Sequence, residues 1–261
     1  MRIDNREYLF GIPFHSWNMS QTVQAICDRI EAGVFTQHVV INVAKVVYAQ
    51  KDAALRASIA SCDIINVDGM GVVWGCKLLG YAVPERVAGV DLFLKLIRMS
   101  EEKAFPVYLL GAKDDVVKKT TEVLMEKYPK LNIAGSHHGY FWDDEDTVVR
   151  QIKDSGAKLL FVAITSPKKE NFINKWRGEL GIDYVMGVGG SFDVIAGKVR
   201  RAPEWMQKAG MEWLYRLMQE PGRMWRRYLY TNAMFLWMLV KGMLSERFKT
   251  HGWIDNCSHP K

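Results

Sequence analysis

Asp68 is the residue whose type and position most clearly indicate chemistry. It follows the short apolar run Ile64–Val67 and precedes an apolar segment that opens at Gly69. This pattern predicts a buried strand that turns into a helix, and ligands of open parallel sheets bind beyond the carboxyl ends of the strands. The carboxylate could instead cap the helix that opens at Gly69, and spacing alone favours that structural role.

Other polar residues occupy comparable positions. Asn42 ends the predicted strand His38–Asn42 and could lie beside Asp68 in a parallel sheet. Its amide could bind sugar hydroxyls or cap the next helix, and the spacing favours the cap. Arg86 lies in a predicted loop, where a solvated surface arginine is the commoner outcome. Asp193 could bind a ligand or accept hydrogen bonds from loop amides, and the sequence does not separate these two roles.

A glycine cluster follows the last predicted strand and comprises Gly187, Gly189 and Gly190. Its backbone N–H groups could form a nest for phosphate or sugar oxygens, but a tight turn that needs positive φ explains the glycines equally well. The dinucleotide pattern G-x-G-x-x-G would require glycine at Phe192, and a G-x-x-x-x-G-K-[ST] phosphate loop is absent. These observations argue against an ordinary dehydrogenase or NTPase.

The sequence indicates no metal site, no cofactor and no secretion signal. Its four cysteines form no C-x-x-C pair and no disulfide-framework spacing, which predicts reduced thiols in a cytosolic protein. The N-terminus lacks the basic and apolar regions of a signal peptide. The longest apolar run, Leu229–Leu244, is shorter than the roughly 20 apolar residues of a spanning helix, so it could lie on a membrane but is not expected to cross one.

The excess positive charge is concentrated at the C-terminal end. Residues 198–261 contain 12 Lys and Arg and 5 Asp and Glu, a net charge of +7. Residues 1–197 contain 23 basic and 24 acidic residues, a net charge of −1, and the whole chain carries +6. A neutral body with a basic end indicates a polyanionic partner: nucleic acid, a diphosphate or an anionic membrane surface.

Three arginines in the basic segment have spacings that return to one helix face. Arg216, Arg223 and Arg226 are separated by seven and three residues, so their guanidinium groups could converge despite a break near Pro221. Forked guanidinium donors match the oxygens of a diphosphate and supply positive charge without a metal. Aromatic residues between them are typical of a helix on anionic lipid, although the same composition can bind single-stranded nucleic acid.

The order of the predicted elements indicates an α/β protein with a helical C-terminal appendage. A first strand is expected at Tyr8–Ile12, and from residue 20 helices alternate with strands up to residue 197, which predicts a parallel sheet with helices on both faces. After Ala202 only helices are predicted, over Pro203–Gln219 and from Arg223 to about Arg247. We therefore expect a Rossmann-like core over residues 1–197 and a helical appendage over residues 198–261.

With these residues in view, the chain resembles the TagA/WecG/CpsF family of glycosyltransferases, family 26 in the sugar-enzyme classification. The resemblance spans about Val39 to Tyr228 and consists of ordered blocks. These blocks are INVAK (41–45), VDGMGVV (67–73), ERVAGVDL (85–92), GYF (139–141), SPKKE (166–170), GVGGSFDVIAGKVRRAP (187–203) and MEWLYRLMQEPGRMWRRY (211–228). Several blocks in one order are far more specific than any single motif.

The resemblance implies a peripheral membrane enzyme on the inner face of the cell membrane. Such enzymes transfer one sugar, typically N-acetylmannosamine or its uronic acid and in some relatives glucose, from a UDP donor to N-acetylglucosamine on a polyprenyl diphosphate. The transfer inverts the anomeric carbon without a bound metal, and the C-terminal appendage completes the active site. The expected partners are thus the UDP-sugar, the lipid-linked acceptor and an anionic membrane rather than nucleic acid, and a homo-oligomer is left open. The rival interpretation is a noncatalytic membrane- or nucleic-acid-binding protein that uses its basic tail.

The resemblance also assigns roles to individual residues. It implies that Asp68 is the catalytic base, which takes the proton of the attacking hydroxyl. It also implies that the appendage arginines Arg216, Arg223 and Arg226 bind diphosphate. The chain has Lys169 where the family usually has glutamine, so an ammonium group there could bind phosphate or an acidic sugar. We expect the pocket for the donor and its sugar to contain Asn42, Arg86, Asp91, Lys169, Gly187, Gly189, Gly190 and Asp193.

Overall fold

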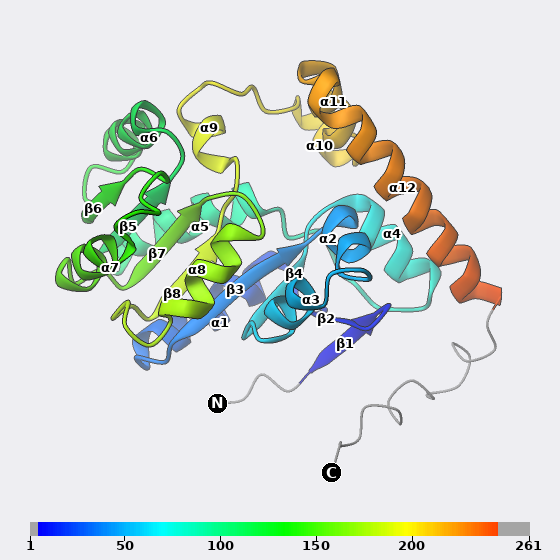
Figure 1. Cartoon of the computed structure of the whole chain (residues 1–261), viewed down its shortest axis with the longest axis horizontal. Coiled ribbons are helices and arrows are strands. Elements are labelled where there is room, and N and C mark those ends of the chain that lie inside the picture. The colour runs from blue at the N-terminus through cyan, green and yellow to red at the C-terminus, as the bar shows by residue number, and fades with distance from the viewer. Residues whose placement is uncertain (1–4, 245–261) are drawn as a thin grey trace, which may run out of the picture.

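The structure is a computed structural model, and it describes residues 5–244 except for the side chain of Arg223 (Figure 1). The strands are β1 (Arg6–Leu9), β2 (Ile12–His15), β3 (Thr36–Ile41), β4 (Ile64–Val67), β5 (Val107–Gly111), β6 (Ile133–His137), β7 (Leu159–Ala163) and β8 (Tyr184–Gly187). The helices of the core are α1 (Met19–Glu31), α2 (Val43–Tyr48), α3 (Ala53–Ala60), α4 (Met70–Leu78), α5 (Gly89–Glu102), α6 (Asp114–Lys127), α7 (Glu145–Asp154), α8 (Lys168–Trp176) and α9 (Ser191–Ile195). The last helices are α10 (Glu204–Lys208), α11 (Glu212–Gln219) and α12 (Pro221–Leu244).

The core is a six-stranded sheet in the order β4-β3-β8-β7-β5-β6, and every neighbouring pair is parallel. Helices cover both faces of this sheet, as parallel strands require for their crossovers (Figure 1). The predicted Rossmann-like α/β architecture is therefore confirmed.

Alternating side chains of the strands divide the core into two layers. On one face, Phe161 of β7 belongs to a buried cluster with residues of α1, α5, α6 and α9. On the other face, Leu160 and Val162 pack with α7 and α8, while Ile65 of β4 packs with α2, α3 and α4. This period of two is what a sheet buried on both faces requires.

The connections after β3 and β8 leave the sheet on opposite faces. Val46 and Val47 of α2, the helix after β3, join the cluster on one face, whereas Phe192 of α9, the helix after β8, joins the cluster on the other. Because β3 and β8 are adjacent, their diverging connections leave a crevice beyond the carboxyl ends of these two strands. Such a switch point is where ligands bind in open α/β sheets.

The prediction of a single first strand at Tyr8–Ile12 was wrong. The segment forms the antiparallel hairpin β1-β2, and Phe10 and Gly11 turn the chain with φ of 51° and 76°. Two successive positive φ values form the tight turn that suits the twist of a hairpin. The hairpin lies along the edge strand β4, where the backbone N–H of Ile65 donates to Nδ1 of His15 at 3.0 Å.

The helix predicted over Pro203–Gln219 is two helices, because Gly210 adopts a φ of +72° between α10 and α11. The next helix begins at Pro221 rather than at Arg223, since proline suits the first turn of a helix. Its predicted end near Arg247 lies outside the described residues. A short helix, α9, also forms in the glycine-rich segment after β8, where no helix was predicted.

The helix α12 packs against the core rather than on a hydrophobic centre of its own. Its buried residues Phe235, Met238 and Leu239 belong to the same cluster as α2, α4 and the hairpin. The fit is close at Gly75 of α4, where a Cβ atom would lie 2.8 Å from Cζ of Phe235. The boundary at residue 197 stays a prediction, but the segment that follows it depends on the core for burial.

A buried polar chain runs across β8, β3 and the edge strand β4 to α1. The Tyr184 hydroxyl donates to Nδ1 of His38 (2.7 Å), Nε2 of His38 donates to Oδ1 of Asn66 (2.9 Å), and Nδ2 of Asn66 donates to the Thr22 hydroxyl (3.0 Å). Burial lowers the pKa of His38 to about 3, although the hydrogen bond to Asn66 opposes this. His38 is thus held neutral in the folded protein.

This burial predicts a loss of stability in mild acid. Below about pH 6.5 His38 becomes protonated in the unfolded chain, whereas in the folded protein it stays neutral down to about pH 3. The unfolding free energy therefore decreases as the pH is lowered over this range, by up to about 1.4 kcal/mol per pH unit from this group. Urea unfolding between pH 7 and pH 4 should show a shallower slope for His38→Gln than for the wild type. The partly exposed His138→Gln is the matched control, and equal slopes for wild type and His38→Gln would contradict the prediction.

Candidate functional site

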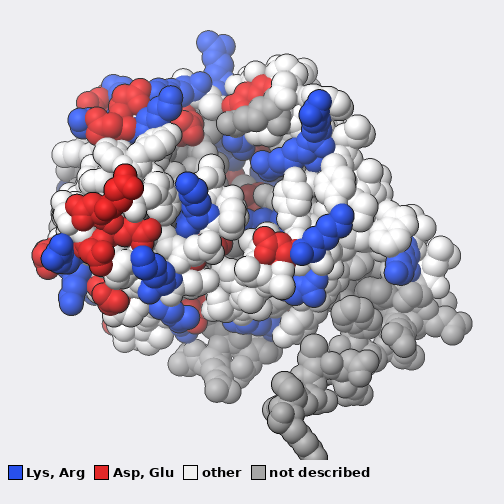
Figure 2. Space-filling model, viewed as in Figure 1, with Lys and Arg blue, Asp and Glu red and all other residues white. Residues whose placement is uncertain are grey.

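The residues predicted to do chemistry gather at the carboxyl ends of β3, β4 and β8. Asp68 and Asn42 follow adjacent strands, and the N–H of Asp68 donates to the carbonyl of Ile41 at 2.8 Å. Figure 2, viewed as Figure 1, shows a hollow in the upper middle of the molecule, between α9 and α11, with Lys and Arg side chains on its walls. The sheet therefore places these two strand-end residues side by side.

Asp68 does not cap the helix that follows it. The N-cap of α4 is Gly69, which has no side-chain cap, whereas Oδ2 of Asp68 accepts a hydrogen bond from the N–H of Gly89 at 3.2 Å. Gly89 is the first residue of α5, so the carboxylate lies at the N-terminus of a different helix, where the helix dipole favours negative charge. The cap favoured by spacing alone is wrong, because tertiary structure gave this side chain another partner.

Burial raises the pKa of Asp68 above its ordinary value. Arg86, the hydrogen bond from Gly89 and Lys45 oppose this rise, while the Glu212 carboxylate adds to it. A carboxylate with a raised pKa is a stronger base than an exposed aspartate. Asp68 follows β4, the strand next to β3, so it lies beside the switch point. Asp68 is therefore suited to proton transfer.

Asn42 is the N-cap of α2, because its Oδ1 accepts a hydrogen bond from the backbone N–H of Lys45 at 3.0 Å. The capping interpretation of this residue is confirmed. Within the described part of the chain, its Nδ2 makes no hydrogen bond and is available to a ligand hydroxyl. Asn42 can thus keep both the structural role and the predicted sugar contact.

Arg86 is not a solvated loop arginine. Only 13% of its side chain is exposed, and Nη1 forms an ion pair with Oε2 of Glu212, on α11, at 2.9 Å. Glu212 also lies 3.5 Å from Nε of Arg201, and both terminal nitrogens of Arg201 bind the Asp91 carboxylate at 2.6 Å. The predicted sugar-binding residue Asp91 is thus engaged by Arg201, a residue that was not predicted for the site.

Lys169 is buried with two charged residues that were not predicted. Its Nζ lies 2.9 Å from Oε1 of Glu170, and Nζ of Lys45 lies 3.6 Å from the same oxygen. Burial raises the pKa of Glu170, but the ammonium groups of Lys169 and Lys45 outweigh it and hold the pKa below its ordinary value. Burial and the charge of Lys169 lower the pKa of Lys45 to about 8. This cluster carries two cations against one anion, so it favours an anionic ligand nearby.

The glycine cluster lies at the end of β8, the strand next to β3 in the sheet. Gly187 ends β8 against the stem of Lys169, where a Cβ atom would lie 2.5 Å from Cε. Gly189 has a φ of +53°, and the N–H groups of Gly189 and Gly190 donate no hydrogen bond to the described residues. The free N–H groups fit the nest interpretation, while the positive φ shows that the tight turn is present as well.

Arg216 of α11 reaches over this nest. A Cβ atom at Gly190 would lie 3.0 Å from Nη2 of Arg216 and 3.8 Å from Oδ2 of Asp193, which places both predicted residues at the nest. Nε of Arg216 is buried without a hydrogen-bond partner among the described residues. A guanidinium beside free backbone N–H groups is a suitable environment for phosphate oxygens.

The other two predicted diphosphate arginines are not seen to join Arg216. Arg226 lies on the exposed face of α12, with its guanidinium 5.3 Å from the ring centre of Trp225. Arg223 has its backbone in α12, but its side chain lies outside the described atoms. The predicted convergence of the three arginines therefore stays a prediction.

Residues 5–244 contain no group of three or more His, Cys, Asp or Glu that could hold a metal ion. Among the helices described, none is long and apolar enough to cross a membrane.

Comparisons with known proteins define the class of protein to which this fold and site belong. A model of the glycosyl transferase WecG/TagA/CpsF family matches residues 7–249. A curated relative from Bacillus subtilis (strain 168), named N-acetylglucosaminyldiphosphoundecaprenol N-acetyl-beta-D-mannosaminyltransferase, is 33% identical over 228 residues, 85% of this chain and 87% of the relative. The protein of the same name from Bacillus spizizenii (strain ATCC 23059 / NRRL B-14472 / W23) is 38% identical over 181 residues, 69% of this chain and 70% of the relative.

The chain therefore belongs to the WecG/TagA/CpsF family of glycosyltransferases, and the resemblance found in the sequence is confirmed. It is a sugar-transferring enzyme.

The burial of Asp68 predicts that this residue opposes folding at neutral pH. Because its pKa is raised in the folded state, its contribution to the unfolding free energy decreases as pH rises from about 4, the ordinary value for aspartate, through the folded pKa. Asp68→Asn can still accept the hydrogen bond from Gly89 but has no charge. Urea unfolding should show that this variant gains stability relative to the wild type between pH 4 and pH 8. If the unfolding free energy of Asp68→Asn instead decreased relative to the wild type over this range, the raised pKa of Asp68 would be contradicted. Asp154→Asn, exposed at the end of α7, is the matched control.

Proposed function

We propose that this protein transfers a sugar from a UDP-sugar to a sugar on a polyprenyl diphosphate during synthesis of a cell-surface polysaccharide. The names of its relatives describe transfer of N-acetylmannosamine to N-acetylglucosaminyldiphosphoundecaprenol, which supports N-acetylglucosamine as the acceptor sugar. N-acetylmannosamine, its uronic acid and glucose are the candidate donor sugars. The observation that carries the proposal is that the partly buried carboxylate of Asp68 and the glycine nest with the Arg216 guanidinium follow strands at the same edge of the sheet.

In the proposed step, an acceptor hydroxyl attacks the anomeric carbon of the donor in a single displacement. The new carbon–oxygen bond forms as the bond to the UDP oxygen breaks, and the configuration of that carbon inverts. The proton of the hydroxyl passes to Asp68, whose raised pKa suits a general base. UDP leaves with the bonding electrons, so the site must stabilise negative charge on its diphosphate.

The residues that suit this second task lie at the end of β8. The free N–H groups of Gly189 and Gly190 and the Arg216 guanidinium can donate hydrogen bonds to the diphosphate, and this step requires no metal ion. The buried cluster of Lys45, Lys169 and Glu170 adds a net positive charge nearby. Arg223 and Arg226 stay candidates for the acceptor's diphosphate.

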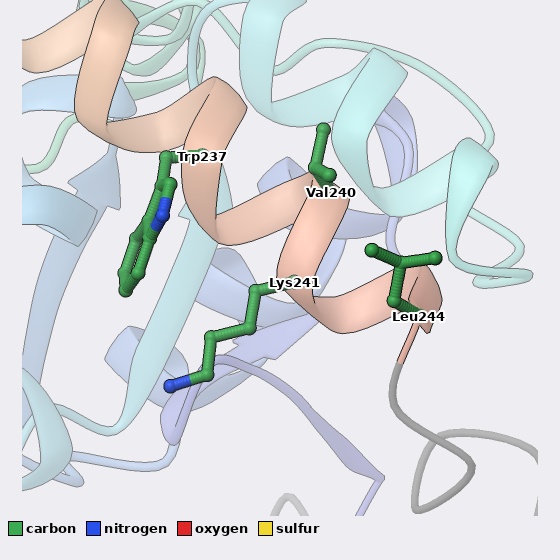
Figure 3. A pocket seen from close by; sticks show the side chains of 4 residues that line it. All are labelled: Trp237, Val240, Lys241 and Leu244. Atoms are coloured by element: carbon green, nitrogen blue, oxygen red, sulfur yellow. The ribbon is translucent and has the colours of Figure 1, made fainter.

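The helix α12 supports the proposed contact with an anionic membrane on the cytoplasmic side. Its outer face exposes apolar and aromatic side chains, among them Leu236 (61% exposed) and Trp237 (56%). Figure 3 shows Trp237 and Lys241 projecting to the same side of the helix, and Nζ of Lys241 lies 5.2 Å from the ring centre of Trp237. Aromatic rings beside basic residues are typical of helices at the lipid headgroup level. The family assignment favours this enzyme at a membrane over the noncatalytic protein considered from the sequence.

The role of Asp68 can be tested by its removal. Asp68→Asn should lower kcat by roughly 10²- to 10⁴-fold, because no other group would take the proton from the acceptor hydroxyl. The measurement is UDP release from a panel of UDP-sugars in the presence of a lipid-diphosphate N-acetylglucosamine acceptor. The control Asp154→Asn should keep the wild-type rate, and an unchanged rate in Asp68→Asn would remove this residue as the base.

The membrane contact can be tested on the exposed face of α12 without touching the core. Replacing Leu236 and Trp237 with serine should weaken co-sedimentation with anionic vesicles at least about tenfold, because each buried apolar side chain contributes roughly 1.5–3 kcal/mol. The control Met125→Ser removes a similarly exposed side chain (54%) from α6, which lies on the far side of the molecule from α12 (Figure 1). Vesicle binding that is equal in the double variant and the wild type would exclude this face.

A further inference from the structure

A chain of alternating charges connects the appendage to Asp68. Arg201 binds the Asp91 carboxylate with both terminal nitrogens at 2.6 Å and lies 3.5 Å from Glu212, which in turn binds Arg86 at 2.9 Å. Arg86 is the strongest cationic influence on Asp68. Three carboxylates thus alternate with two guanidiniums, and none of the arginines that the structure describes is bound to Asp68, at one end of the chain.

The backbone brings Arg86 alongside Asp68. The N–H of Val87 donates to the carbonyl of Val67 at 2.9 Å, and the N–H of Gly89 donates to the Asp68 carboxylate at 3.2 Å. The segment 86–89 therefore runs past the end of β4. Within the part of the chain that the structure describes, Arg86 makes its ion pair with Glu212 and forms none with Asp68.

We propose that Glu212 is a positioning residue for sugar transfer, which holds the Arg86 guanidinium on the appendage side and thereby keeps it from pairing with Asp68. This inference rests on the proposed function, in which Asp68 takes the proton of the acceptor hydroxyl. A guanidinium bound directly to Asp68 would occupy the oxygens that must accept the proton and would make the carboxylate a weaker base. The docked appendage thus sets the state of the base as well as covering the site.

Arg86 is largely shielded from water, so it depends on a nearby carboxylate as its counter-ion. With 13% of its side chain exposed, it needs an anion, since a buried charge without a partner is costly. Without the Glu212 charge, Asp68 is a carboxylate whose charge Arg86 already influences. The charged groups that face Asp68 are Arg86 from the loop, Lys45 from α2 and Glu212 from α11, and the N–H of Gly89 faces it from α5.

The direct test measures the protonation of Asp68 by carbon-13 NMR of its labelled carboxyl group in the full-length protein. Glu212→Gln removes the charge with little change in size, and the Asp68 titration midpoint should move to lower pH. In parallel, the acidic limb of the pH profile of kcat/KM for UDP release should also move to lower pH. The plateau value of kcat/KM should be at least tenfold lower than that of the wild type. Glu212→Asp should recover part of both effects, and Glu204→Gln, an exposed glutamate of α10, should leave both unchanged.

Arg86→Gln distinguishes positioning from a direct charge effect of Glu212. In the Arg86→Gln background, adding Glu212→Gln should move the Asp68 midpoint downward much less than in the wild type, because only the direct charge effect of Glu212 remains once the guanidinium that would pair with Asp68 is gone. A downward shift of equal size in that background would overturn the proposal, since Glu212 would then act on Asp68 by its own charge alone. An unchanged midpoint in the single variant Glu212→Gln, with circular dichroism showing an intact fold, would overturn it as well.

Failure of the proposed function would look different. If Asp68→Asn kept full activity, Asp68 would not be the base, and Glu212 would have no role in positioning for the transfer whatever the midpoints showed. If Asp68→Asn were inactive but the midpoints did not respond to Glu212→Gln, only the positioning role would be wrong.

Discussion

The packing of α12 against α2 and α4 is the constraint on which the site depends. Phe235 fills a space that exists because Gly75 has no side chain, and Met238 and Leu239 complete the same buried cluster. This packing anchors the C-terminal helices to the edge of the sheet that carries β3 and β4 (Figure 1). The short helix α11 is thereby held over the crevice, where Glu212 meets Arg86 and Arg216 meets the glycine nest.

The site combines charges that folding alone would not favour. Asp68 is a partly buried carboxylate whose pKa is raised, and Lys45 is a partly buried amine whose pKa is lowered to about 8. Each charged form is disfavoured by its surroundings, so the protein gives up stability to keep these groups at the crevice. Such an arrangement is expected where a base must accept a proton on one side and a departing diphosphate must be stabilised on the other.

Much of the fold and part of the site could be predicted from the sequence. Strand periodicity located β3, β4 and β7 and placed Asn42 and Asp68 at neighbouring strand ends, because buried parallel strands have short, continuous apolar runs. The hairpin β1-β2 was missed because its turn uses Phe10, a bulky residue that seldom adopts positive φ. The turn at Gly210 was missed because a single glycine within a helical pattern is often tolerated.

The partners of the site residues could not be predicted, because they come from distant segments. Nothing local to Arg86 indicates that Glu212, 126 residues later, is its counter-ion. Arg201 resembled the rest of the basic segment, although it is the residue that binds Asp91. For Lys169 a signal was present, since the adjacent Glu170 offered a counter-ion for its charge in the buried cluster with Lys45.

We propose that the core and the appendage together form one diphosphate site, with the Arg216 guanidinium lying over the nest of Gly189 and Gly190. Isothermal titration calorimetry of UDP binding to the full-length protein is the most direct test of this shared site. Arg216→Gln should raise the Kd for UDP at least about tenfold, because a charge-assisted hydrogen bond contributes roughly 1.5–3 kcal/mol. Arg150→Gln, an exposed arginine of α7, should leave the Kd unchanged. Equal affinity of Arg216→Gln and the wild type for UDP would contradict the account.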